Sequence, residues 1–170
     1  SVNGEKVSAM CIKHVGITSD WYRELEITAD LLDGRGLSTE RVRFADVPAF
    51  VILKALALDQ RQENKDAADL IHVVRYAGTL DQVAKMFVER ILSELHPNAI
   101  AEGLAALRRR FCDDVHGEGY RKVGPLAYAA FQDRGDDDDR VGAQLYAAGL
   151  IQSLLDRIDE QLSAHSRQPQ

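Results

Sequence analysis

The chain has 170 residues, a net charge of −6, a pI of about 5.3, and 45% hydrophobic and 28% charged residues. These values are typical of one globular domain with a real core, and the acidic balance argues against a protein that coats nucleic acid non-specifically. No apolar run approaches the roughly 20 residues of a membrane span. Cys11 and Cys112 are too far apart for a zinc knuckle and favour a reducing compartment. We therefore expect a cytoplasmic location and no membrane partner.

The first 45 residues are predicted to form strands. Residues 6–15 are β-prone, and residues 21–32 alternate polar and apolar side chains with the period of a half-buried strand. A glycine-containing turn at residues 33–36 leads to a second alternating run at residues 40–44. Two strands alone are only marginally stable. We therefore expect residues 1–45 to complete a sheet whose other strands are contributed elsewhere.

The rest of the chain is predicted to be helical. Asp46 is a good N-cap for a helix ending near Arg61, and Thr79 is a good N-cap for another ending near residue 95. Further helices are expected at about residues 64–76, 99–111 and 136–162, and residues 126–131 could be a short strand or a helical turn. The predicted fold is α+β: a small N-terminal sheet, then a helical domain of about five helices at residues 46–163, then a frayed tail at 164–170.

Helical spacing of apolar residues predicts the faces that form the core. The expected core residues are Phe50, Leu53, Leu56, Leu70, Val73, Val74, Phe87, Ile91, Leu104, Leu107, Leu145, Ile151 and Leu155. The four consecutive acids at 136–139 are a weak metal-site candidate, because consecutive residues do not converge on an ion, and we interpret them as a helix N-terminus. Arg108, Arg109 and Arg110 are interpreted as a solvated helix end.

Lys54 is the candidate functional residue. It is the one charged residue among the nine at positions 50–58, and the other eight are apolar. An ammonium group in such a helix must snorkel to water, pair with an acid or face a polar pocket. Asp66 and Asp69, at the start of the next helix, are the candidate partners. Lys54 could point into a phosphate-binding cleft, or it could simply snorkel beside an acidic first turn.

Residues 44–78 resemble the second half of bacterial nucleotidyltransferase-like proteins of the AbiEii toxin type. The resemblance rests on Lys54, Ala57 and Arg61 in one helix and on Lys65-Asp66 and Asp69-Leu70 in the next. The stretch 95–131 is similar to the helical C-terminal region of one branch of this family, so the resemblance covers about 130 residues.

This resemblance implies a site and a reaction. Lys54 would contact the triphosphate of an NTP, Asp66 would hold Lys54 in place, and Arg61, Lys65 and Asp69 would line the nucleotide-binding cleft. Lys54 and Asp66 are thus the candidate catalytic residues. The acceptor of the nucleotide would be a tRNA end, a protein hydroxyl or a small molecule such as an aminoglycoside.

One part of the family pattern is missing from the sequence. The family's Gly-Ser or Gly-Gly turn and Asp-x-Asp, whose acids hold Mg²⁺, would lie before residue 1, and nothing in this chain replaces them. Because nucleotidyl transfer needs metal to neutralise developing charge, we expect Mg²⁺ and NTP chemistry only if that segment is supplied. The alternative hypothesis is a non-catalytic interaction module, or a degenerate family member, that pairs with a partner chain or a second copy to complete the sheet.

The sequence pattern does not decide which acid holds Lys54 in place. The family pattern indicates Asp66, whereas antiparallel packing of two helices joined by a short turn favours Asp69, one turn further along. We predict Asp66 as the partner, with Asp69 as the fallback, and we expect the pair to be only partly buried so that donors remain for phosphate.

Overall fold

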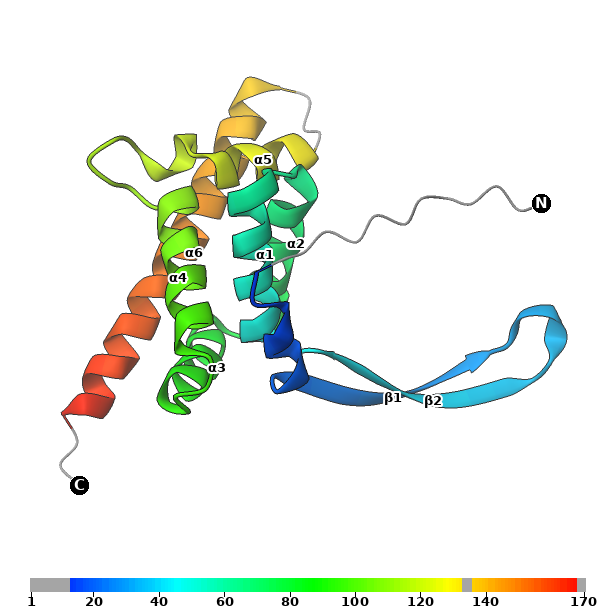
Figure 1. Cartoon of the computed structure of the whole chain (residues 1–170). Helices are drawn as coiled ribbons and strands as arrows, with labels where there is room; N and C mark the ends of the chain where they lie inside the picture. Colours follow the sequence, from blue (N-terminus) through cyan, green and yellow to red (C-terminus); the bar gives the residue numbers. More distant parts are fainter. Residues whose placement is uncertain (1–12, 133–135, 168–170) are drawn as a thin grey trace.

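The computed structural model describes residues 13–132 and 136–167, and within these it consists of one antiparallel hairpin and six α-helices (Figure 1). The helices are α1 (Val47–Arg61), α2 (Asn64–Tyr76), α3 (Leu80–Leu92), α4 (Pro97–Phe111), α5 (Val123–Phe131) and α6 (Asp137–Ser166). The predicted α+β fold is confirmed. The helix beyond the five expected is α5, in the region where the sequence left a strand or a helical turn open.

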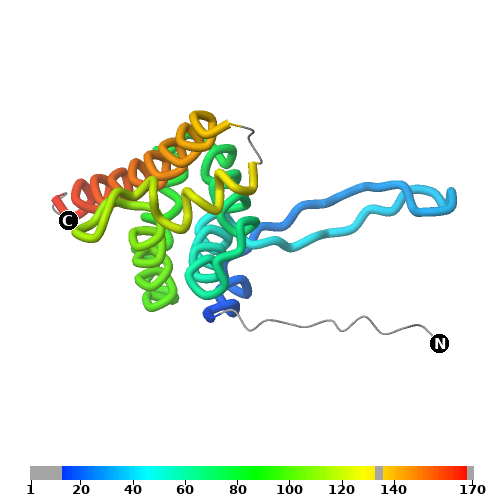
Figure 2. The backbone as a smooth tube through the Cα atoms, turned by 90° about the horizontal axis from the view of Figure 1, so that it is seen from above, coloured from blue at the N-terminus to red at the C-terminus, as the bar shows by residue number. Residues whose placement is uncertain are grey.

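The two strands, β1 (Tyr22–Asp30) and β2 (Leu37–Ala45), pair along their whole length, from Tyr22 opposite Ala45 to Asp30 opposite Leu37. Their connection contains a short 3-10 helix, η2 (Leu32–Gly34), and Gly36 with a positive φ of 93° that favours glycine. Figures 1 and 2 show the hairpin projecting away from the helices as an arm. Residues 6–12 of the predicted strand at 6–15 lie outside the described residues, and the prediction is wrong for residues 13–15, which form a turn and the start of a 3-10 helix.

Three contacts anchor the base of this arm. Trp21, which precedes β1, is fully buried, and its carbonyl accepts a hydrogen bond from the backbone N–H of Asp46. The Asp46 side chain accepts from the N–H of Ala49 at 2.9 Å, which confirms the predicted N-cap of α1. Arg90 of α3 donates to the same carboxylate and lies over the Trp21 ring. The arm is thus fixed to the bundle at its root.

The helices pack around α1, whose apolar side chains are buried against α2, α3 and α4, while α6 contacts α3, α4 and α5. Two further 3-10 helices, η1 (Val15–Ser19) and η3 (Gly119–Arg121), contact this bundle. Thr79 is the N-cap of α3, as the sequence predicts, and it forms a capping box with Gln82, but α3 ends at Leu92 rather than near residue 95.

Most of the predicted core is confirmed, with one clear error. Of the expected positions, seven are buried: Leu56, Leu70, Val74, Phe87, Leu107, Ile151 and Leu155. Leu53, Val73, Ile91 and Leu104 are half-buried against the core, and Phe50 is half-buried. Leu145 is wrong, because it is 53% exposed. The first buried residue of α6 is Ala147. The turns before it also carry apolar side chains of the stripe, but the neighbouring helices do not cover them.

The structure defines both ends of α6, one as predicted and one beyond the predicted position. The backbone N–H of Asp139 donates to the Asp136 side chain at 2.8 Å, so the acidic run is a helix N-terminus as predicted. The helix continues to Ser166, past the residue where the tail was predicted to begin, and residues 168–170 lie outside the described residues.

Candidate functional site

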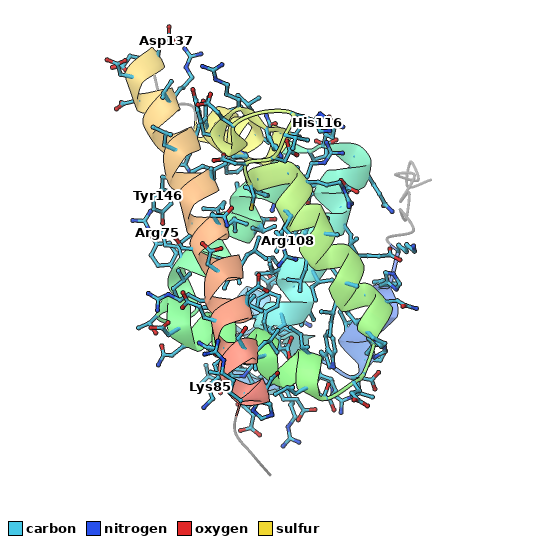
Figure 3. The ribbon with its side chains drawn as sticks, turned by 90° about the vertical axis from the view of Figure 1, so that its left-hand side faces the viewer. Arg75, Lys85, Arg108, His116, Asp137 and Tyr146 are labelled. Carbon is cyan, nitrogen blue, oxygen red and sulfur yellow. The ribbon has the colours of Figure 1, made fainter. Side chains whose placement is uncertain are left out.

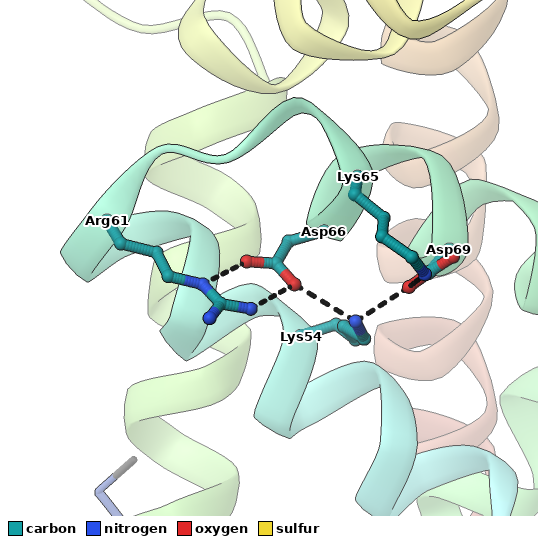
Figure 4. A network of polar contacts seen from close by, with 5 residues as sticks. All are labelled: Lys54, Arg61, Lys65, Asp66 and Asp69. Carbon is teal, nitrogen blue, oxygen red and sulfur yellow. Dashed lines mark hydrogen bonds and ion pairs between the residues drawn. The ribbon is translucent and has the colours of Figure 1, made fainter. Parts of the chain in front are cut away.

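Lys54 lies in the middle of α1 and reaches both candidate acids. Its Nζ donates to Oδ1 of Asp66 at 3.0 Å and to Oδ2 of Asp69 at 2.7 Å (Figure 4). Asp66 and Asp69 are three residues apart on α2 and therefore share one helix face. The sequence posed these two acids as alternatives, and the structure brings both of them to the same ammonium group.

The short connection between α1 and α2 makes this convergence possible. Gln62 adopts a left-handed conformation with φ 55° and caps α1 by donating its backbone N–H to the Leu58 carbonyl, and Glu63 then occupies the N-cap position of α2. Asn64 is the first residue of α2. The tight turn brings the first turns of α2 back over the last turns of α1. Packed in this way, Asp66 and Asp69 are both within reach of the long Lys54 side chain.

Two more cations complete a five-residue network, which we call the Lys54 network: Lys54, Arg61, Lys65, Asp66 and Asp69. Arg61 donates from Nε to Oδ2 of Asp66 at 2.6 Å and from Nη2 to Oδ1 at 2.8 Å. This two-point pairing is the strongest geometry available to a guanidinium and a carboxylate. Lys65 donates to Oδ2 of Asp69 at 2.7 Å. All five residues singled out by the sequence therefore lie in one cluster.

The side chains of the network differ in how far they are exposed to solvent. The Asp66 side chain is 1% exposed, whereas those of Lys54 and Arg61 are 22% and 32% exposed. The buried carboxylate is thus covered by cations that themselves reach solvent. An ammonium group has three donors and a guanidinium has five, so Lys54 keeps one N–H beyond its two acids and Arg61 keeps three beyond Asp66. These donors are the part of the network that can contact an added anion.

The electrostatics hold both acids in the charged form. Burial acts to raise the pKa of Asp66, but the hydrogen bonds and charges of Arg61 and Lys54 outweigh it and leave the pKa below its usual value. Asp69 shows the same balance, with burial opposed by Lys54 and Lys65, and its pKa is also lowered. Burial acts to lower the pKa of Lys54, but its two acids outweigh this and raise the pKa.

These acids do not fit a magnesium site. Both Asp66 oxygens and one Asp69 oxygen already accept from ammonium or guanidinium groups, which would compete with and repel a divalent cation. Across residues 13–132 and 136–167 there is also no group of three or more His, Cys, Asp or Glu side chains placed to hold a metal. The Lys54 network therefore consists of cations around the buried Asp66 and the partly exposed Asp69.

A pocket of about 390 Å³ lies between α2 and α5 and borders the network at Asp69. Asp69 lines it, together with His72 and Arg75 from α2 and with Tyr128 and Phe131 from α5. Lys54 is not among its lining residues. The contribution of α5 carried no sequence signal, because its fold was left open.

The basic run at the end of α4 is the other feature that the sequence misread. Arg109 and Arg110 both donate to the Asp59 carboxylate of α1, at 2.8 and 2.7 Å, and Arg108 pairs with Asp159 of α6. Burial acts to raise the pKa of Asp59, but its two arginines lower it overall. The run therefore ties α4 to α1 and α6 and is not only a solvated helix end.

Comparison with protein-family models, with curated proteins and with solved structures finds no match to this chain. In the part of the chain that the structure describes, no helix is both long enough and apolar enough to cross a membrane.

Proposed function

We propose that this chain supplies the cationic side of a nucleotidyltransferase-like site, in which Lys54 contacts the phosphates of an NTP. The supporting observation is the convergence of Lys54, Arg61, Asp66 and Asp69 on one partly exposed network at the spacing of the family motif. Donor groups held in place by buried acids lose little conformational freedom when an anion binds.

Each residue has a defined task in this proposal. Asp66 is the positioning residue, because it is buried and fixes both Lys54 and Arg61. Lys54 and Arg61 offer their remaining donors to phosphate oxygens, and the more exposed Lys65 lies at the rim. Transfer of a nucleotide requires a metal-holding segment in addition, so the chain by itself binds the triphosphate without catalysing transfer. We place this function in the cytoplasm, where the buried thiol of Cys112 stays reduced.

Isothermal titration calorimetry with inorganic triphosphate and with ATP tests the proposal. The expected result is weak binding that persists without Mg²⁺, since this chain's contacts to the phosphates are cationic side chains. Lys54→Ala should abolish the binding. Asp66→Asn should weaken it while the domain stays folded by circular dichroism, because the cations lose their anchor.

Lys85→Ala is the matched control. Lys85 lies on α3 and makes no ion pair with any residue that the structure describes. Its replacement should therefore leave triphosphate binding unchanged. Equal binding by Lys54→Ala and the unchanged protein would contradict the proposal. If Lys54→Ala, Asp66→Asn and Asp69→Asn change only the melting temperature, the network has a structural role alone.

The hairpin favours a second candidate function, an interaction module. One face of the arm is polar, with Glu24 paired to Arg43 at 2.6 Å and Thr28 bonded to Thr39. The opposite face is apolar and exposed, and Leu25, Ile27, Val42 and Phe44 are each 40–55% accessible. An isolated two-stranded sheet is marginally stable, so an added protein surface on this face would stabilise the arm.

A second copy of this chain fits the apolar face. Along the face, Arg23 opposite Phe44 comes first, then Leu25 opposite Val42, then Ile27 opposite Glu40. If two such faces stack in opposite directions about a two-fold axis at the middle pair, β1 lies over β1, so each Arg23 lies over Ile27 of the other copy and next to its cross-strand neighbour Glu40. Arg23 makes no ion pair with a residue that the structure describes. The face is therefore self-complementary, as a two-fold interface requires.

Sedimentation velocity over a range of concentrations tests this second candidate. The interaction predicts a dimer. Arg23→Glu should weaken this dimer, and the double variant Arg23→Glu with Glu40→Arg should restore it. Thr28→Glu, on the polar face, is the control and should leave the dimer intact. A monomer at every concentration, or a dimer that none of the charge changes affects, would exclude the interface.

A further inference from the structure

The pocket between α2 and α5, described above as bordering the Lys54 network, combines exposed aromatic rings with an arginine that lacks an acidic partner. Tyr76 and Phe131 line it and are 63% and 51% exposed. Rings of this size are normally covered, because each carries a large apolar surface. Their exposure at the mouth of one pocket marks a surface that gains free energy when a flat apolar group covers it.

Arg75 is held by ring contacts from two helices. Its guanidinium carbon lies 5.1 Å from the centre of the Tyr76 ring and 5.4 Å from that of Tyr146 on α6. Figure 3 shows Arg75 and Tyr146 next to each other on this face. Arg75 makes no ion pair or hydrogen bond with any residue in the described part of the chain. A positioned guanidinium with all its donors free is suited to a carboxylate or a phosphate.

The other charges around the pocket do not oppose an anion there. Among the lining residues that the structure describes, Asp69 is the one carboxylate, and Lys54 and Lys65 both donate to it. The His72 ring lies tilted against Tyr76 with ring centres 4.7 Å apart, and it adds a further polar group to the wall. The pocket volume of about 390 Å³ lies within the range of small-molecule sites, roughly 300–1,000 Å³.

We propose that this pocket binds a small planar aromatic anion, with the ring against Tyr76 and Phe131 and the carboxylate or phosphate on Arg75. This site is separate from the triphosphate contacts of the proposed function, because Lys54 does not line it. Failure of one proposal therefore leaves the other standing.

Ligand-observed and ¹⁵N-detected NMR titrations test the site with four probes. Indole-3-carboxylate and phenyl phosphate carry both a planar ring and an anionic group, and they distinguish a carboxylate from a phosphate ligand. Indole-3-carboxamide lacks the charge, and cyclohexanecarboxylate lacks the flat ring. At least one planar anion should bind about tenfold more tightly than both control compounds and should shift the amides of α2 and α5.

Variants place the binding in this pocket. Arg75→Gln should weaken the planar anion about tenfold or more, and Phe131→Leu should weaken it through loss of the ring. Arg121→Gln is the matched control, because Arg121 also lies over a tyrosine ring, that of Tyr120, but outside this pocket. The proposal is overturned if neither planar anion binds, if the uncharged probe binds equally well, or if Arg75→Gln and Phe131→Leu both leave the affinity unchanged.

Discussion

Asp66 is the residue on which the geometry of the Lys54 network depends. It is buried, yet it stays charged because Lys54 and Arg61 donate to it from the same helix, α1. Removing one partner of a buried ion pair is costly because the other charge is left uncompensated. Here Lys54 and Arg61 reach solvent, so hydration of their charges offsets part of the free energy that is lost.

We expect Asp66→Asn to lower the free energy of unfolding by about 2–3 kcal/mol, below the roughly 3–5 kcal/mol of a fully buried pair. Urea denaturation measures this change. Glu26→Gln is the control, because Glu26 pairs with Arg41 on the exposed arm at 3.4 Å and should cost less than about 0.5 kcal/mol. Equal costs for the two variants would mean that the network contributes no more than a surface pair.

The lowered pKa values of Asp66, Asp69 and Asp59 give the protein a defined acid sensitivity. A carboxyl whose folded pKa lies below its unfolded value of about 3.9 contributes stability that is complete above that value. As the pH falls through the folded pKa, this stability is lost. The free energy of unfolding should therefore decrease from about pH 5 downward. In urea titrations, the difference in free energy of unfolding between Asp66→Asn and the unchanged protein should decrease over the same pH range.

At the scale of elements, α1 and α4 approach each other closely at a glycine. A Cβ added to Gly103 would lie 2.7 Å from Cγ2 of Ile52, which is fully buried on α1. Such a contact cannot form without movement of one helix or of the Ile52 side chain. Gly149 on α6 has open space at the same position of its own backbone.

These two glycines therefore predict opposite effects of one substitution. Gly103→Ala should destabilise the protein by about 1–3 kcal/mol through overpacking. Gly149→Ala should stabilise it by about 0.5–1 kcal/mol, because alanine is the better helix former and meets no neighbour. Thermal unfolding followed by circular dichroism compares them. A destabilising Gly149→Ala, or a neutral Gly103→Ala, would show that the α1–α4 contact is looser than described.

The sequence predicted those elements whose signals are local. The N-caps of Asp46 and Thr79 and the strand β1 each depend on signals within a few residues, and each is confirmed, although β1 is exposed along most of its length and not half-buried as predicted. Lys54, Asp66 and Asp69 were predicted from the residue pattern. Arg61 and Lys65 were predicted from the family resemblance. The choice between Asp66 and Asp69 was not predictable, since it depends on the helix crossing. The aromatic pocket is built by α2 and α5 together, and it left no pattern in either helix alone.

At the scale of the whole molecule, the chain combines a well-packed helical bundle with an arm that contributes little to its core. Leu107 is fully buried between α4 and its neighbours, whereas Leu145 carries the same side chain at a solvent-exposed turn of α6. The two residues have similar sequence surroundings, and spacing alone assigned both to the core.

This pair tests the assignment of the core. Leu107→Ala should cost about 2–5 kcal/mol through lost burial and a cavity. Leu145→Ala should change stability by less than about 0.5 kcal/mol, as for other surface substitutions. Chemical denaturation of both variants measures the difference. Similar costs at the two positions would mean that α6 is rotated relative to the bundle.

The central claim is that Lys54 is a phosphate contact held ready by two acids. The most direct measurement is the ¹⁵N shift of the Lys54 Nζ during a titration with inorganic triphosphate in the absence of Mg²⁺. We expect a saturable shift of that nitrogen, with the Lys85 Nζ unchanged and with the Lys54 response reduced in Asp66→Asn. An Nζ resonance of Lys54 that stays constant throughout the titration, with the ion pairs to Asp66 and Asp69 intact, would contradict it.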